Sequence, residues 1–402
     1  MTGAMTAVMT GARTGARTGL LGRLAGLAAL LAVGACASTA PVSDIQPGER
    51  PALETDEAGF WMAFDEFEAD LKASSLVVRD PALNHYVRGI VCNLAGDYCA
   101  DIRVYIVRHP AFNASMGPNG TMQVYTGLLL RAENEAQLAY VLGHELGHFI
   151  RRHTLTRMRD IRNKTDAASV LGLAGAMVGV PYSGLIASGV AYASISAYSR
   201  DQEREADEIG FEMFRRAGYE PSQASRIWGL LIAEAEAGDW PDPPILFATH
   251  PATQERQATL ERLAEDASDG PSSTYEQRYQ SAILQFRSQW LRDDLRMRNF
   301  SGSEHLYKRL AESGHGRGEA LFYLGEVYRL RDDEGDDQKA VEAYGQALAE
   351  RDAPPQVFRS LAFVEWSLGH REAARQAFER YLEIAPQADD RLMIRLHIEE
   401  LS

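Results

Sequence analysis

The sequence has little cysteine and fewer basic than acidic side chains. Only three of its 402 residues are cysteine, too few for a small fold held together by disulfides. Lys and Arg number 41 against 56 Asp and Glu, giving a formal net charge of −15. Nucleic-acid binders carry basic faces that neutralise phosphates, so we expect no nucleic-acid partner. The chain is 45% hydrophobic and therefore globular in composition, and at roughly 100–200 residues per domain it suggests two or three domains.

The N-terminal region lacks acidic residues and any hydrophobic run long enough to span a membrane. The apolar stretch Leu24–Val33 follows three arginines, whereas a membrane span needs about 20 residues. This pattern indicates an export signal over residues 1–35. Small residues before Cys36 favour a lipoprotein signal, after whose removal Cys36 is the lipidated N-terminus. An ordinary cleaved signal followed by an incidental cysteine is the alternative.

Export also bears on the two remaining cysteines. In an oxidising compartment we expect Cys92 and Cys99 to form a disulfide. The six residues between them have a turn-like composition that brings the two thiols close. A pair of reduced thiols in the core is the alternative.

Pattern changes along the chain predict its organisation. Residues 36–58 are rich in Pro, Ser and acids and predict a tether. Alternating and β-branched residues predict strands at Asp101–Val107 and Met122–Tyr125, and from Asn134 onward the pattern is helical. The first globular domain is therefore expected to cover residues 59–264 and to be α+β, mostly α, with a small sheet.

Residues 167–199 contain no charged side chain, which by length alone suggests a transmembrane span. Glycines and a proline weaken that interpretation, and one span here would separate two halves of the candidate site described below. We expect a helical hairpin beside the site. It either packs into the domain, which we favour, or lies at a membrane surface.

The C-terminal region repeats itself. A set of three small or aromatic residues, Ala340, Tyr344 and Ala347, has counterparts 34 residues later. These counterparts are Ala374, Phe378 and a further tyrosine. This period is typical of tetratricopeptide helix pairs. We expect a polar hinge at residues 265–278 and an all-α tetratricopeptide-like domain at residues 279–402.

The chemistry-bearing motif is the run His-Glu-Leu-Gly-His. His144 and His148 are four residues apart, so a helix places both imidazoles on one face, where they can bind one Zn²⁺ with Glu145 beside them as a base. His153 is about half a helical turn out of phase, so it does not share that face. Downstream, Glu203 and Asp207 also lie four residues apart, one suited to bind the metal and the other to orient a ligand.

The motifs HELGH and SRDQEREAD together resemble the HtpX-like and CAAX-prenyl-protease-like zinc metallopeptidases, which are of the gluzincin type. Asn113-Ala114, Asn119-Gly120, Thr126-Gly127-Leu128 and the stretch from Thr249 to Arg256 also match that family. The resemblance covers about residues 60–265. With the export signal and the repeats, it points to the soluble periplasmic, BepA-like branch.

The resemblance implies a zincin-like domain that binds one zinc ion per chain. The implied ligands are His144, His148 and Glu203, with Glu145 catalytic and Asp207 supporting a ligand from behind. It also implies that an extended substrate lies along an edge strand near Asn113 and Ala114.

Two further residues of this region need separate treatment. His250 belongs either to a structural His-Pro turn or to a removable fourth ligand that closes the open metal position. Arg256 is a candidate for contact with the substrate carbonyl.

These features together predict an exported zinc endopeptidase acting on unfolded or misassembled envelope proteins. Its repeats would bind clients or partner proteins, and a lipidated Cys36 would anchor it to a membrane. By analogy this is the outer membrane, because Ala37 rather than an acid follows the cysteine. The alternatives are a non-proteolytic periplasmic chaperone or scaffold with a structural zinc site, and a protein that combines both functions.

Overall fold

The computed structural model describes residues 43–164, 198–238, 250, 254–267 and 272–402. The predicted signal, Cys36 and nearly all of the uncharged segment 167–199 lie outside these residues. Among the described helices, none combines the length and apolar character that a membrane span requires.

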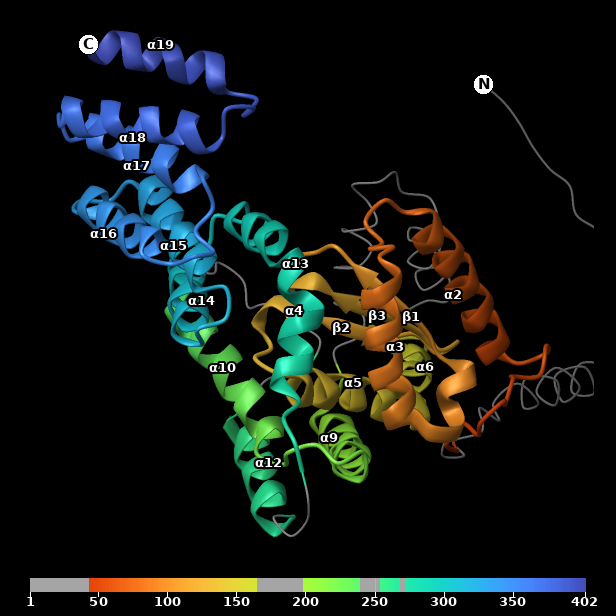
Figure 1. Cartoon of the computed structure of the whole chain (residues 1–402). Coiled ribbons are helices and arrows are strands. Elements are labelled where there is room, and N and C mark those ends of the chain that lie inside the picture. Colours follow the sequence, from red (N-terminus) through yellow and green to blue (C-terminus); the bar gives the residue numbers. More distant parts are fainter. Residues whose placement is uncertain (1–42, 165–197, 239–249, 251–253, 268–271) are drawn as a thin grey trace, which may run out of the picture. The chain divides into compact units, whose positions relative to one another are not determined.

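Figure 1 labels the helices and strands, which follow one another along the chain. The first part of the chain contains α2 (Asp56–Ala73), α3 (Pro81–Ala95), the 3₁₀ helix η1 (Gly96–Asp101), β1 (Arg103–Val107), β2 (Ala114–Met116), β3 (Thr121–Tyr125), α4 (Thr126–Arg131), α5 (Glu135–Ile150) and α6 (His153–Lys164). The middle part contains α9 (Arg200–Arg216), α10 (Gln223–Ala237) and α12 (Gln254–Asp266). The last part contains α13 (Glu276–Leu295), α14 (Phe300–Glu312), α15 (Arg317–Arg331), α16 (Asp336–Leu348), α17 (Gln356–Ser367), α18 (Arg371–Ile384) and α19 (Arg391–Leu401).

The three strands form one sheet in the order β1-β3-β2, in which β1 is parallel and β2 antiparallel to β3. The turn between β2 and β3 contains Gly120, whose φ of 86° favours glycine. A Cβ there would lie 2.2 Å from the carbonyl oxygen of Asp101. The strands predicted at 101–107 and 122–125 are β1 and β3, and β2 lies next to β3 at one edge of the sheet. The strand β2 contacts α5, so this sheet edge lies beside the central helix (Figure 1).

The end of α3 is tied to η1 by a disulfide between Cys92 and Cys99. The six residues between them are the end of α3 and the first half of η1, so the two cysteines are brought together by helical turns and not by an irregular loop.

The described part of the predicted tether, residues 43–55, does not run free of the domain. Ile45 is buried, its N–H donates to the carbonyl of Ile150 at 3.0 Å, and its own carbonyl accepts from the hydroxyl of Tyr98 at 2.9 Å. The Gly48 N–H donates to Asp101 at 2.7 Å. Composition suggested a solvated linker, but one buried isoleucine and paired backbone groups hold this segment against the domain.

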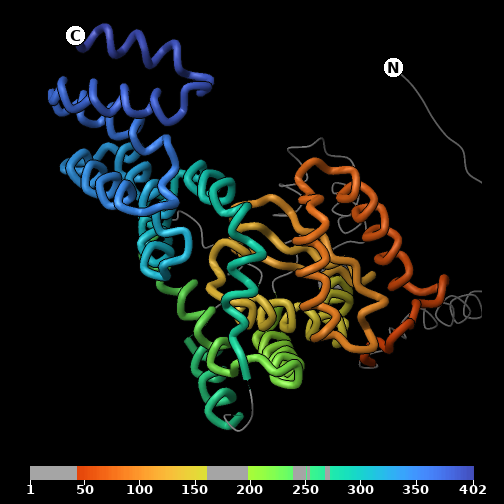
Figure 2. The backbone as a smooth tube through the Cα atoms, in the orientation of Figure 1, coloured from red at the N-terminus to blue at the C-terminus, as the bar shows by residue number. Residues whose placement is uncertain are grey.

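Beyond residue 276 every described element is a helix, and consecutive helices pack against each other from α13 to α19 (Figure 2). The predicted fold class, mostly α with a small sheet followed by a helical region, is confirmed. Helix α13 also contacts α3, α4 and α5, and the Arg108 guanidinium donates to Asp293 at 2.6 and 2.7 Å. The tetratricopeptide assignment and the boundaries at 265–278 stay predictions.

Candidate metal centre

Helix α5 carries the first two site residues. Asn134 caps its N-terminus, with the side-chain oxygen accepting the N–H of Gln137 at 3.0 Å. Every residue of the helix is buried, so it forms the centre of the domain. As the four-residue spacing predicted, His144 and His148 lie on one face, with their Nε2 atoms 3.1 Å apart.

Helix α9 brings a carboxylate to this face. It begins with a capping box between Ser199 and Gln202. Helices α5 and α9 meet at glycines: a Cβ on Gly210 would lie 2.7 Å from the backbone nitrogen of His144, and one on Gly147 would lie 2.9 Å from the carbonyl oxygen of Ala206. The two backbones therefore approach closely enough for the Glu203 carboxylate to reach both histidines.

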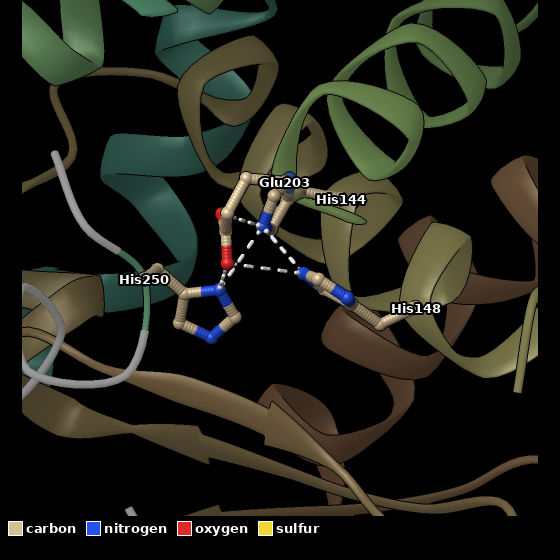
Figure 3. Close-up of side chains that lie close together, drawn as sticks. All are labelled: His144, His148, Glu203 and His250. Atoms are coloured by element: carbon tan, nitrogen blue, oxygen red, sulfur yellow. Dashed lines mark hydrogen bonds and ion pairs between the residues drawn. The ribbon is translucent and has the colours of Figure 1, made fainter. Parts of the chain in front are cut away.

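Four buried side chains converge at this crossing. Ligand atoms of His144, His148, Glu203 and His250 all lie within 4.8 Å of one another (Figure 3). The Nδ1 of His250 is 3.0 Å from Oε1 of Glu203 and 3.2 Å from Nε2 of His144. Glu203 Oε1 is 3.7 Å from Nε2 of His148. His250, which sequence reasoning left between two roles, thus lies inside the cluster.

The electrostatics of the cluster favour a cation. Burial lowers the pKa of His148 well below its ordinary value, so this imidazole is neutral and offers a lone pair. Burial by itself raises the pKa of Glu203, but His250, His144 and Arg256 outweigh it and hold that pKa well below its usual range. Burial also lowers the pKa of His144, yet Asp207 and Glu203 raise it to about 9. His148 and Glu203 thus already offer a neutral imidazole nitrogen and a charged carboxylate, whereas His144 keeps a second proton at neutral pH that a bound divalent metal would displace.

Asp207 supports His144 from behind. Its Oδ1 lies 2.9 Å from Nδ1 of His144 and accepts the Tyr140 hydroxyl at 2.7 Å. Burial raises the pKa of Asp207, but the guanidinium of Arg256 outweighs this and lowers it to about 2. The charged carboxylate therefore holds the Nδ1 proton of His144, so that Nε2 is the ring nitrogen directed into the cluster.

Glu145 and Arg256 each contact a member of this cluster. Glu145 is 2% exposed, its Oε1 lies 3.4 Å from Nε2 of His250, and burial raises its pKa. Arg256 is buried and donates to Asp207 through two nitrogens at 2.7 Å each, while a third lies 2.6 Å from Glu203. Its guanidinium also lies over the ring of Trp228 at 4.4 Å. The arginine that we expected to contact substrate is thus bound to the two carboxylates.

The predicted substrate edge adjoins the cluster through helix α5. Asn113 precedes β2, and its carbonyl accepts the N–H of Tyr125 at 3.1 Å. Ala114, the first residue of β2, is fully buried. Among the described residues β2 pairs only with β3, and it contacts α5, so it is an edge strand beside the helix of the two histidines.

Sequence reasoning missed several neighbours of the cluster. The ring of Tyr198 stacks on His148 with centroids 3.8 Å apart, and Trp228 lies edge-on to His144 at 6.4 Å. His153, which the helical phase removed from the ligand face, contacts His148 from the other side at 2.8 Å. No motif marks Tyr198 or Trp228, because non-local packing brings them to the site.

A buried histidine pair on one helix, a carboxylate from a second helix and a buried glutamate beside the pair are typical of zincin-like metallopeptidases with a glutamate ligand. Residues 77–264 match the model of Peptidase family M48. Over these residues this chain is therefore similar to the Peptidase family M48 domain.

Curated relatives agree with this assignment. The chain is 26% identical over 210 residues to the beta-barrel assembly-enhancing protease of Escherichia coli strain K12, covering 50% of this chain and 42% of that protein. It is 24% identical over 267 residues to the protein of the same name from Yersinia pestis, covering 62% and 54%. It is 27% identical over 218 residues to the mitochondrial metalloendopeptidase OMA1 of Danio rerio, covering 50% and 45%. The chain thus spans about half the length of the curated relatives it matches.

Proposed function

We propose that this protein is a zinc-dependent endopeptidase. The observation that carries the proposal is the buried convergence of His144, His148 and Glu203 beside Glu145, within a peptidase-family domain. These three ligands would hold one Zn²⁺ per chain, since imidazole nitrogen and carboxylate oxygen suit this metal. Bound zinc supplies a Lewis acid that polarises a peptide carbonyl and acidifies water.

The protein's own residues have distinct roles in this proposal. Glu145 takes a proton from the attacking water and returns it to the leaving amine. Asp207 keeps the His144 ring in the ligand orientation. Arg256 balances the charge of Glu203 and Asp207, and its earlier assignment to substrate contact is replaced here by this positioning role.

The substrate backbone pairs with β2 near Asn113 and Ala114, on the side that no described strand occupies. Such pairing selects an extended conformation through main-chain hydrogen bonds and leaves the side chains loosely specified. Unfolded or misassembled proteins expose extended segments, which supports them as substrates.

His250 acts as a removable fourth ligand that closes the metal site when no substrate is bound. Its place within hydrogen-bonding distance of both Glu203 and His144 supports this role. His250→Ala is expected to raise the rate of proteolysis while zinc stays bound through the other three ligands. Unchanged proteolysis together with unchanged zinc content would remove this part of the proposal.

The setting is the bacterial envelope. The export signal with Cys36 supports a periplasmic lipoprotein at the outer membrane, and two of the relatives are named beta-barrel assembly-enhancing proteases. The helical repeats after residue 279 would bind client or partner proteins.

The test pairs zinc content with cleavage of an unfolded protein such as casein, for the wild type and for Glu145→Gln. The substitution keeps the ligands and removes the base, so we expect one zinc in both proteins and cleavage only by the wild type. Equal cleavage by Glu145→Gln would refute the assigned base. Zinc in both proteins, with no cleavage by the wild type or by His250→Ala, would favour the chaperone or scaffold alternative.

A further inference from the structure

His153 is brought beneath His148 by the turn between α5 and α6. Helix α5 ends at Ile150, and Arg152 adopts a φ of 52°, a left-handed conformation that is uncommon for a residue with a side chain. The Arg152 guanidinium is held by ion pairs with Glu49 and Glu57. The chain therefore leaves the helical path of α5 and places His153, which is 4% exposed, at the start of α6.

Three side chains form a continuous line behind the metal-site face. Nδ1 of His148 lies 2.8 Å from Nδ1 of His153, and Nε2 of His153 lies 3.0 Å from Oε2 of Glu205. The other oxygen of Glu205 lies 3.0 Å from Nε of Arg151. This line ends in a carboxylate on α9, the same helix that carries Glu203 and Asp207.

Assigning a donor and an acceptor to each of these hydrogen bonds leaves one arrangement of protons in which His148 can bind a metal. Two ring nitrogens at 2.8 Å share a single proton. Nε2 of His148 faces His144 and Glu203 and needs a free lone pair for metal binding, so the proton of neutral His148 is on Nδ1 and is donated to His153. His153 then carries its own proton on Nε2 and donates it to Glu205.

We infer that His153 and Glu205 are positioning residues of the metal centre, which hold the ring of His148 with its Nε2 lone pair directed at the metal. Asp207 fixes the orientation of the His144 ring directly. Glu205 fixes that of the His148 ring through His153, which lies between the ligand and the carboxylate. This inference rests on the metal site of the proposed function, but not on proteolysis. Loss of such a partner typically lowers metal affinity by about 10–100-fold.

The test measures zinc affinity by competition with a chelator, using the full-length protein in a Glu145→Gln background so that the readout is independent of cleavage. His153→Leu removes the acceptor while keeping an apolar side chain of comparable bulk. His153→Asn keeps an acceptor, because its Oδ1 is one bond beyond Cγ, as Nδ1 is in histidine. We expect about 10–100-fold weaker zinc binding for His153→Leu and a smaller loss for His153→Asn.

Two substitutions on α9 serve as the matched pair. Glu205→Gln weakens the acceptor of the His153 proton, whereas Glu208 is exposed on the same helix and Glu208→Gln is the control. We expect weaker zinc binding for Glu205→Gln and none of that loss for Glu208→Gln. Equal losses for His153→Leu and His153→Asn would indicate a packing role and overturn the inference, as would wild-type affinity in both. If His153→Leu does not fold, the comparison of Glu205→Gln with Glu208→Gln decides alone.

Discussion

Arg131 joins three parts of the fold, and its replacement by methionine gives a quantitative test of the packing. The residue ends α4 and is buried, and its guanidinium donates to Glu234 of α10 at 2.8 Å and to Asp294 of α13 at 2.6 Å. A third hydrogen bond, at 2.9 Å, reaches the carbonyl of Pro110, just before the edge strand β2. Burial by itself lowers the pKa of Arg131, but the two carboxylates outweigh it and raise that pKa.

The magnitude follows from what Arg131→Met leaves behind. Asp294 keeps the hydroxyls of Ser303 and Tyr307 at 2.8 and 3.0 Å. Glu234 is 5% exposed, and among the described residues its Oε2 has no hydrogen-bond partner, so it loses its ion pair without replacement. Removing one partner of a buried pair typically costs about 3–5 kcal/mol, because a charge remains buried and uncompensated.

The assay is urea unfolding of the wild type, Arg131→Met and the control Arg226→Met, whose ion pair with Glu133 is 59% exposed on the arginine side. We expect a loss of about 3–5 kcal/mol for Arg131→Met and about 0–1 kcal/mol for Arg226→Met. The double substitution Arg131→Met with Glu234→Leu removes the orphaned charge and should recover part of the loss. Equal effects of the two single substitutions, or a further loss in the double variant, would refute the reasoning.

Two further predictions concern backbone packing and pH. A Cβ on Gly210 would lie 2.8 Å from the carbonyl carbon of Gly143, so Gly210→Ala should push α9 away from α5, lower the stability of the protein by about 1–3 kcal/mol and weaken zinc binding. The control Gly345→Ala is at an open helical position and should instead stabilise the protein by about 0.4–1 kcal/mol. Unaltered zinc affinity in Gly210→Ala would contradict the argument. Hydrogen bonds, mainly from Arg331, lower the pKa of Asp336 to about 2. Because this folded pKa lies below the unfolded value, the stabilisation by Asp336 is present at neutral pH and is lost as the pH falls through about 4 towards 2. The free energies of unfolding at about pH 7 and about pH 3 should therefore differ less in Asp336→Asn than in the wild type.

The parts of this protein that sequence predicts best are those set by local periodicity. The four-residue spacing of His144 and His148 and that of Glu203 and Asp207 each fix a shared helix face, and both pairs meet in the structure. Alternation likewise located β1 and β3. These features depend only on residues within a few positions of each other, so no knowledge of distant contacts was needed.

The parts that sequence missed depend on a change of direction or on distant partners. The helical phase predicted that His153 lies away from the ligand face, on the assumption that α5 continues to residue 153. The helix instead ends before Arg152, which has a positive φ, and His153 contacts His148. Composition suggested a tether before residue 58, yet the buried Ile45 binds that segment to the end of α5. The Arg131 ion pairs connect residues 103 and 163 positions apart, a separation at which no sequence pattern is informative.

The short run from Glu203 to Asp207 shows why α9 matters beyond its ligand. Glu203 faces the metal cluster, Asp207 supports His144, and Glu205 reaches His148 through His153. Because all three carboxylates belong to one helix, a displacement of α9 changes the ligand and both supports together. The glycine contacts between α5 and α9 therefore set the geometry of the whole centre, and metal affinity should depend more steeply on that helix crossing than on any single hydrogen bond.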